Sequence, residues 1–198
     1  IDGIEIKIGE NDEILLKGPT ITPGYYMRDA NNAEAFDEDG YFHTGDAGYM
    51  ENGELFLKER IKDLFKTSNG KYVAPQQIEA LLLVDKYIDQ CAVIADQRKF
   101  VSALIVPEFN TIEEWAQEHH IIYSSREELC ENTQVYDMLL DRIKTLQQGL
   151  ASYEQIKRIM ILPHHFSMET GELTNTLKLK RPVINKIYKS VIEKMYEE

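Results

Sequence analysis

The chain has few cysteines, little positive charge and no long apolar run. Its two cysteines, Cys91 and Cys130, form no CxxC pair, which predicts inert thiols in a reducing cytoplasm rather than a disulfide-stapled secreted fold. Lys and Arg number 22 against 34 Asp and Glu, a net charge of −12, so nucleic acid would be repelled. No segment approaches the roughly 20 consecutive apolar residues of a membrane-spanning helix. These absences predict a cytoplasmic protein that binds no nucleic acid and does not span a membrane.

The composition is nevertheless sufficient for a folded core. The 198 residues are 43% hydrophobic and 10% aromatic, which separates the chain from disordered proteins. The length suits one domain, or one domain with part of another. The chain begins with Ile, and IDGIEIKIG has the pattern of a strand already under way. We therefore expect this sequence to be a piece of a longer protein.

Residues 1–60 carry the pattern of short antiparallel strands. Alternating apolar residues and turn signals predict two hairpins and one short helix: strands at 4–8 and 14–16, a helix at 29–36, and strands at 47–50 and 55–57. Asn52-Gly53 supplies the turn of the second hairpin, because both residues tolerate a positive φ. This segment is expected to be a β-rich remnant of a larger domain.

The polar run KERIKD at 58–63 marks a boundary, and residues 61–198 predict a compact module with a short sheet flanked by helices. Strands are expected at 64–67, 71–73, 91–95, 102–106 and 156–162, and helices at 75–83, 111–119, after Ser125, at 135–146 and from Pro182 to the end. Thr111 and Ser125 are expected to cap their helices. The fold class is therefore α+β.

Three segments contain side chains that could carry chemistry. The first is YFHTGD, Tyr41–Asp46, a turn of small residues that ends in a carboxylate. An ionised Asp accepts two hydrogen bonds, so Asp46 could receive the vicinal hydroxyls of a sugar. An aspartate that caps its own turn has the same pattern.

The second segment, Glu59–Glu79, joins the two structural patterns. Its cations alternate with apolar residues: Arg60, Lys62, Lys66 and Lys71. A long charged side chain at a domain joint can form different ion pairs in two orientations of the domains. A solvated linker whose lysines protect a strand edge fits the pattern equally well.

The third segment is Gly171–Arg181, where small and hydroxylic residues lead to Lys178. A lysine on a mobile loop can bring a point charge to phosphate or carboxylate oxygens. A solvated loop before a helix is the alternative. The histidines offer no metal site, because His119-His120 and His164-His165 are adjacent pairs without the i, i+4 spacing of helical ligands.

Taken in order, these segments resemble the adenylate-forming superfamily, and within it the bacterial-type long-chain fatty acid CoA ligases. The matching stretches are EILLKGPTITPGYY from Glu13, YFHTGD, ERIKDLFKTSNGKYVAPQQIE, YSSREEL (123–129) and GELTNTLKLKR. The resemblance implies a two-step reaction: a fatty acid and ATP give acyl-adenylate and pyrophosphate, and the thiol of coenzyme A then displaces AMP. It also implies a large N-terminal domain, of which residues 1–60 would be the end, and a small C-terminal lid formed by residues 61–198.

The resemblance assigns a role to six residues. Asp46 would accept hydrogen bonds from the ribose of ATP, and Arg60 would donate one nearby. Lys62 would be the hinge residue between the two domains. Lys178 would reach the α-phosphate and the attacking carboxylate in the adenylation step. The turn at Asn69-Gly70 would border the tunnel for coenzyme A.

This sequence departs from the family at two of its turns. Asn69 stands where many relatives have Gly, and the turn is expected to survive because Asn tolerates the left-handed conformation. Asn175 stands where relatives often have Pro, which is expected to loosen the loop before Lys178. The phosphate-binding loop, the acyl pocket and the residue that coordinates Mg²⁺ with ATP are expected upstream of Ile1. The 198 residues alone are therefore expected to be inactive.

The expected partners are fatty acid, ATP, coenzyme A and the protein's own N-terminal domain. Residues 178–198 hold six basic and three acidic residues, so this last helix could contact anionic lipid at the inner face of the membrane. A solvated helix face is the commoner explanation of such a pattern. Two other functions remain open: transfer of the acyl group to another acceptor such as acyl carrier protein, and a noncatalytic interaction module that kept an enzyme's fold.

Overall fold

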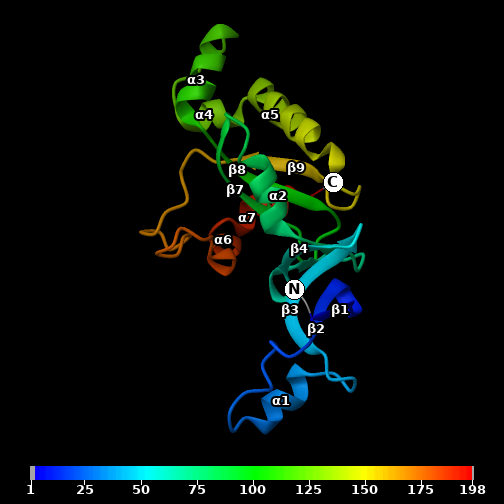
Figure 1. Cartoon of the computed structure of the whole chain (residues 1–198). Coiled ribbons are helices and arrows are strands. Elements are labelled where there is room, and N and C mark those ends of the chain that lie inside the picture. Colours follow the sequence, from blue (N-terminus) through cyan, green and yellow to red (C-terminus); the bar gives the residue numbers. More distant parts are fainter. Residues whose placement is uncertain (1–2, 198) are drawn as a thin grey trace. The chain divides into compact units, whose positions relative to one another are not determined.

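The computed structural model describes residues 3–197 and divides into two compact units, Ile1–Leu64 and Phe65–Glu198 (Figure 1). We call them the N-terminal unit and the C-terminal unit. The α+β class is confirmed, because each unit combines a small sheet with helices. The change between units falls after Leu64, four residues beyond the domain limit expected at residue 60. Ile1, on which the expectation of a truncated start rests, lies outside the described residues.

The N-terminal unit is a four-stranded antiparallel sheet in the order β1-β2-β3-β4. Its elements are β1 (Glu5–Ile8), η1 (Glu10–Asp12), β2 (Glu13–Lys17), α1 (Asp29–Ala35), β3 (Phe42–Glu51), β4 (Glu54–Arg60) and η2 (Ile61–Asp63). Both predicted hairpins are confirmed. Asn52 and Gly53 have φ values of 51° and 82°, the pair of positive angles that matches a two-residue turn to the twist of its strands.

The C-terminal unit contains a two-stranded hairpin and a three-stranded sheet in the order β7-β8-β9. Its strands are β5 (Phe65–Lys66), β6 (Tyr72–Val73), β7 (Ile88–Ile94), β8 (Val101–Pro107) and β9 (Ile156–Ile161). Its helices are α2 (Pro75–Leu82), α3 (Phe109–Glu118), α4 (Arg126–Glu131), α5 (Thr133–Leu146), η3 (Gln147–Gly149), α6 (Arg181–Ile187) and α7 (Lys189–Lys194). Strand β8 pairs antiparallel with β7 and parallel with β9, so α3, α4 and α5 form the long crossover that a parallel pair needs.

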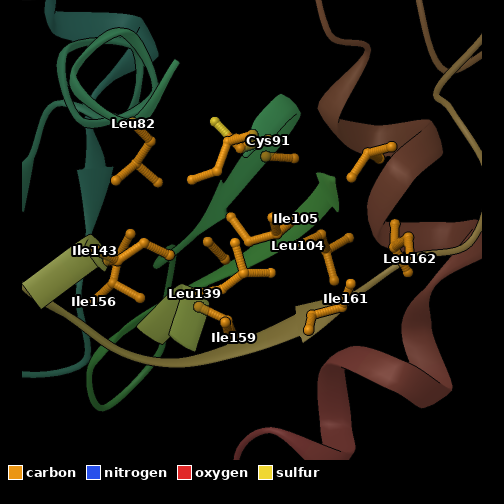
Figure 2. Packing of buried hydrophobic residues seen from close by; sticks show 14 of the residues in the cluster. Leu82, Cys91, Leu104, Ile105, Leu139, Ile143, Ile156, Ile159, Ile161 and Leu162 are labelled. Carbon is orange, nitrogen blue, oxygen red and sulfur yellow. The ribbon is translucent and has the colours of Figure 1, made fainter. Parts of the chain in front are cut away.

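The core of the C-terminal unit is built around β8. Every residue of this strand is buried, as expected for a central strand covered on both faces. Figure 2 shows Leu139 of α5 and Leu82 of α2 pointing toward Leu104 of β8 and Ile159 of β9. Helix α2 packs on β7, and α5 packs on β9. The loops of this unit therefore start and end on elements that are packed into one core.

Two expectations for helices of this unit are wrong. Helix α3 begins at Phe109, and its N-cap is Glu108, whose carboxylate accepts hydrogen bonds from Thr111 N (2.8 Å) and Thr111 Oγ1 (2.7 Å). Thr111 therefore lies inside the first turn and does not cap the helix. The final helix is not continuous, because Tyr188 (φ −94°, ψ 18°) separates α6 from α7. The break coincides with a hydrogen bond from the Tyr188 hydroxyl to the buried Glu172, a tertiary contact that periodicity does not encode.

Candidate functional site

The N-terminal unit fixes Asp46 through the residue two positions before it. Thr44 Oγ1 accepts a hydrogen bond from Asp46 N (3.1 Å) and donates one to Ile14 O (2.6 Å). The expectation of a turn at this position is wrong: Thr44, Gly45 and Asp46 lie within β3, at a bulge where its pairing with β2 shifts register. The threonine hydroxyl holds this bulge, and the Asp46 carboxylate does not cap a turn as the alternative reading supposed. Asp46 is half-buried, with 32% of its side chain exposed.

Glu13 of the neighbouring strand β2 holds the same bulge, a role that sequence reasoning missed. Its Oε1 accepts a hydrogen bond from Gly45 N at 2.9 Å, and its Oε2 lies 2.9 Å from His43 Nδ1. Gly45 has a φ of +70°, a conformation that glycine adopts without strain. The one available signal was that Glu13 opens the first of the matching stretches. The carboxylate therefore fixes the backbone on the N-terminal side of Asp46.

Asp46 and Arg60 are brought together by the sheet. They are directly opposite each other in the pairing of β3 with β4, and Arg60 Nε lies 3.3 Å from Asp46 Oδ1. The arginine side chain is 72% exposed, so solvent screens this pair and its contribution to stability is small. The pair presents an acceptor beside a donor at the surface of the unit.

Lys62 lies in η2, two residues before the end of the N-terminal unit. Its side chain is exposed. It borders an open pocket of about 460 Å³ within this unit, lined by Tyr25, Arg28, Asn31, Glu34, Ala35, His43 and Lys62. The position of Lys62 at the change of units agrees with what a hinge residue requires, and the hinge role stays a prediction.

The turn between β5 and β6 carries Asn69 and Gly70. Gly70 N donates to Thr67 O at 2.9 Å, and Gly70 has a φ of +76°. The left-handed residue of the turn is therefore Gly70, and the turn makes no such demand on Asn69. Asn69 Nδ2 donates instead to Lys99 O (3.3 Å) in the loop between β7 and β8. Asn69 therefore adds this contact without straining the turn.

Lys178 lies on a hairpin between β9 and α6, which we call the Lys178 hairpin (residues 173–179) and which is part of the orange segment in Figure 1. A bridge between Leu173 and Leu179 closes it. Lys178 is exposed. Its backbone is bound on both sides by Thr174, whose N donates to Lys178 O (2.8 Å) and whose Oγ1 accepts from Lys178 N (3.0 Å). The ordered hydrogen bonding at Thr174 argues against the loose loop that was expected from Asn175.

Two buried carboxylates anchor the ends of the Lys178 hairpin. Glu79 of α2 accepts both Arg181 Nη1 (2.8 Å) and Nη2 (2.9 Å) as well as Val93 N (2.8 Å). Glu172 accepts hydrogen bonds from Ser167 N (3.0 Å) and from the Tyr188 hydroxyl (2.6 Å). Burial raises the pKa of Tyr188, and its bond to Glu172 raises it further. The hydroxyl therefore remains a donor at any physiological pH.

The thiols are buried, and neither thiols nor histidines belong to a metal-binding group in the part of the chain that the structure describes. Cys91 and Cys130 are both free and buried, and burial raises the pKa of both, that of Cys130 to about 12. His164 and His165 lie near Glu127 (3.9 Å) and Asp89 (3.3 Å), one carboxylate each. Among residues 3–197 no group of three or more His, Cys, Asp or Glu side chains could hold a metal ion. Nor does any described helix have the length and apolarity to span a bilayer.

Comparison with known proteins identifies similar sequences and folds. Residues 62–198 match the family model of the AMP-binding enzyme C-terminal domain. The chain is 37% identical to human long-chain-fatty-acid–CoA ligase 1 over 188 residues. This alignment covers 93% of the chain and 27% of the relative. The chain thus spans about a quarter of the length of the curated relatives it matches.

Solved structures of adenylation domains contain a similar fold. The adenylation domain of a carboxylate reductase from Mycobacterium chelonae matches 99% of this chain with 31% of its own length, at 25% identity and a TM-score of 0.70. The corresponding domain of the carboxylic acid reductase from Segniliparus rugosus, solved with AMP and a co-purified carboxylic acid, matches 98% of this chain with 32% of its own, at 27% identity and a TM-score of 0.68.

Proposed function

The chain belongs to the family of AMP-binding enzyme C-terminal domains, and from that premise we propose that it is the C-terminal part of an AMP-forming long-chain fatty acid CoA ligase. The identity of 37% with a human long-chain-fatty-acid–CoA ligase over 188 residues is the observation that carries this proposal. The remainder of the enzyme would supply the acyl pocket, the phosphate-binding loop and the residue that holds Mg²⁺ with ATP. The 198 residues alone would be inactive.

Within this enzyme the N-terminal unit would hold the sugar of ATP. The Asp46 carboxylate accepts the ribose hydroxyls, and Arg60 donates a hydrogen bond beside it. The chemistry of the pair fits a diol, because one acceptor and one donor stand 3.3 Å apart at the surface. Lys62, two residues before the change of units, serves as the hinge. The structure of a relative with AMP supports a nucleotide as the ligand.

Lys178 would act in the first half-reaction. Negative charge builds on the α-phosphate and the attacking carboxylate in the transition state, and a cation already placed there stabilises it. The exposed position of Lys178 on an ordered hairpin suits this role. Coenzyme A would then pass the turn at Asn69 and Gly70 in the second half-reaction.

The test separates the two half-reactions in the full-length enzyme. Lys178→Ala should lower fatty-acid-dependent exchange of pyrophosphate into ATP by about 10²- to 10³-fold, the usual cost of losing one transition-state donor. The same variant should still convert supplied acyl-AMP and coenzyme A to acyl-CoA. Equal losses in both steps, or no loss in either, would contradict the assignment of Lys178 to adenylation.

The identity of the acceptor needs a separate measurement. The curated relatives are CoA ligases, which favours coenzyme A. We expect the full-length enzyme to release AMP and acyl-CoA when coenzyme A is supplied, and to leave acyl carrier protein unmodified. Acylation of the carrier protein in place of coenzyme A would favour the second candidate.

A further inference from the structure

We propose that Thr174 is the positioning residue for Lys178: its hydroxyl fixes the lysine backbone, so that the ammonium is already placed when the lid closes for adenylation. This inference rests on the proposed function, in which Lys178 acts at the α-phosphate. It concerns a side chain that does not touch the substrate and acts only through the lysine.

Two hydrogen bonds join Thr174 to the backbone of Lys178, one at its carbonyl oxygen and one at its amide nitrogen. Thr174 N donates to Lys178 O at 2.8 Å, and Lys178 N donates to Thr174 Oγ1 at 3.0 Å. The first contact uses only backbone atoms and survives substitution, whereas the second depends on the hydroxyl. Thr174 is half-buried and Lys178 is exposed. The threonine hydroxyl is therefore the side-chain group that orients the Lys178 peptide.

The same hydroxyl organises the tip of the Lys178 hairpin. Thr176 N donates to Thr174 Oγ1 at 3.3 Å, and the two threonine hydroxyls lie 3.0 Å apart. Because a hydroxyl has one hydrogen and two lone pairs, Thr174 can accept from both amides and donate its own hydrogen to Thr176. All of its hydrogen-bonding capacity is then used within the hairpin.

A residue in a strained conformation lies next to the lysine. Leu177 has a φ of +60° and is 67% exposed. A bulky residue in this left-handed region is uncommon and persists only where its surroundings impose it. Leu177 N donates to Thr174 O (2.9 Å), and the next amide donates to Thr174 Oγ1. The bond from Leu177 N uses a backbone carbonyl and survives loss of the hydroxyl, whereas the bond from Lys178 N does not. Without the hydroxyl, the peptide that links Leu177 to Lys178 loses one of its contacts, and the side chain of Lys178 is free to change direction.

The base of the hairpin is held independently of Thr174. Lys180 N donates to Glu172 O at 2.7 Å, and Arg181 is bound to Glu79. Loss of the Thr174 hydroxyl should therefore disturb the tip and leave the fold of the C-terminal unit unchanged. This separation makes a positioning role testable apart from a structural one.

Thr174→Val removes the hydroxyl and keeps the branched shape, and Thr174→Ser restores an acceptor. In the full-length enzyme we expect Thr174→Val to lower pyrophosphate exchange by about 10- to 100-fold through kcat, since a displacement of about 1 Å can cost that much. Conversion of supplied acyl-AMP to acyl-CoA should change by less than about threefold, and Thr174→Ser should recover exchange to within about threefold. Thr176→Val, the same replacement on a residue that does not bind Lys178, is the matched control.

Amide hydrogen exchange on the 198-residue chain gives a second readout that needs no activity. The Lys178 amide should exchange at least about tenfold faster in Thr174→Val than in Thr176→Val, because only the former loses its acceptor. Amides of the β8 core should be unchanged. Equal exchange of the Lys178 amide in both variants would overturn the proposal, as would equal activity of Thr174→Val and Thr176→Val.

The outcomes also distinguish this inference from the function on which it rests. If Lys178→Ala loses pyrophosphate exchange and Thr174→Val does not, the positioning role is wrong and the proposed function stands. If Lys178→Ala retains full exchange, the proposed role of Lys178 fails, and any catalytic role of Thr174 fails with it. Equal loss of both half-reactions in Thr174→Val, with a lower melting temperature, would assign Thr174 a structural role and overturn the proposal.

Discussion

The ion pair between Glu79 and Arg181 is expected to be a major contributor to the stability of the C-terminal unit. The Glu79 side chain is 9% exposed and that of Arg181 is 21% exposed. Three hydrogen bonds end on this carboxylate, two from the guanidinium and one from Val93 N. Removing one partner of a buried pair costs about 3 to 5 kcal/mol. Partial exposure lets the arginine rehydrate, so we expect Glu79→Gln to lower the free energy of unfolding by about 2 to 3 kcal/mol.

Urea unfolding followed by the fluorescence of Trp115 measures this effect. Trp115 is the single tryptophan of the chain and lies in α3, so its signal reports on the C-terminal unit. The matched control is Glu113→Gln, which removes the same charge from an exposed pair with Arg126 (28% and 48% exposed). Its cost should be at most about 0.5 kcal/mol. If Glu79→Gln also lowers the free energy of unfolding by less than about 0.5 kcal/mol, burial does not set the strength of an ion pair in this protein, and the reasoning is refuted.

High salt should separate the two variants further. At 1 M salt the Debye length is about 3 Å, so the exposed pair is screened and the buried one is not. The loss in Glu79→Gln should persist under these conditions, and any effect of Glu113→Gln should vanish. Disappearance of the Glu79→Gln effect in salt would show that the carboxylate is more open to solvent than the structure describes.

Three further predictions follow from the same geometry. Glu13→Ala in the full-length enzyme should raise KM for ATP about tenfold, because the β3 bulge that places Asp46 loses an acceptor worth about 1.4 kcal/mol, and Glu13→Gln should recover most of the loss; an unchanged KM in Glu13→Ala would contradict this. At pH 8 neither Cys91 nor Cys130 should react with Ellman's reagent within minutes, whereas the urea-unfolded chain releases both thiols, and immediate labelling of the folded protein would show that the thiols are accessible. The pKa values of both thiols and of Tyr188 are raised in the fold, so unfolding releases protons at high pH. The free energy of unfolding should therefore fall by up to about 1.4 kcal/mol per pH unit and group, above about pH 9 for the thiols and above about pH 10 for Tyr188, and a flat profile between pH 9 and 11 would count against the burial of these groups.

Local chemistry explains which elements could be predicted from the sequence. The turn at Asn52-Gly53 is determined by two residues that accept positive φ, and the buried strand β8 by an unbroken apolar run. Each signal lies within the segment that it shapes. Such elements form where they are expected whatever surrounds them.

The elements that were predicted wrongly depend on competition or on distant contacts. Glu108 and Thr111 both suit a helix start, and the longer carboxylate of Glu108 reaches two donors of Thr111 at once. The break at Tyr188 accompanies a hydrogen bond to Glu172, sixteen residues earlier. Periodicity describes one helix face and contains no information on such partners.

The site residues divide in the same way. Asp46, Arg60 and Lys178 could be named because each stands within a stretch that resembles a known motif. Glu13 could not be given its role, since it binds Gly45, thirty-two residues later, across a strand pairing that sequence does not specify. Thr174 was hidden for another reason: it is four residues from Lys178, but their contact exists only in the register of the hairpin.

The charge of the chain explains why the placement of Lys178 should matter so much in the proposed function. The net charge of −12 on these 198 residues provides no long-range attraction for ATP from this part of the enzyme, and exposed charges are screened beyond about 8 Å at physiological salt. Arg181, the nearby cation with the most rigid geometry, is already bound to Glu79. Lys178 must therefore act at contact distance, where a shift of about 1 Å changes the rate strongly. An ammonium on a flexible stem gains that precision only if its backbone is fixed, and the hydroxyl of Thr174 is the group that fixes it.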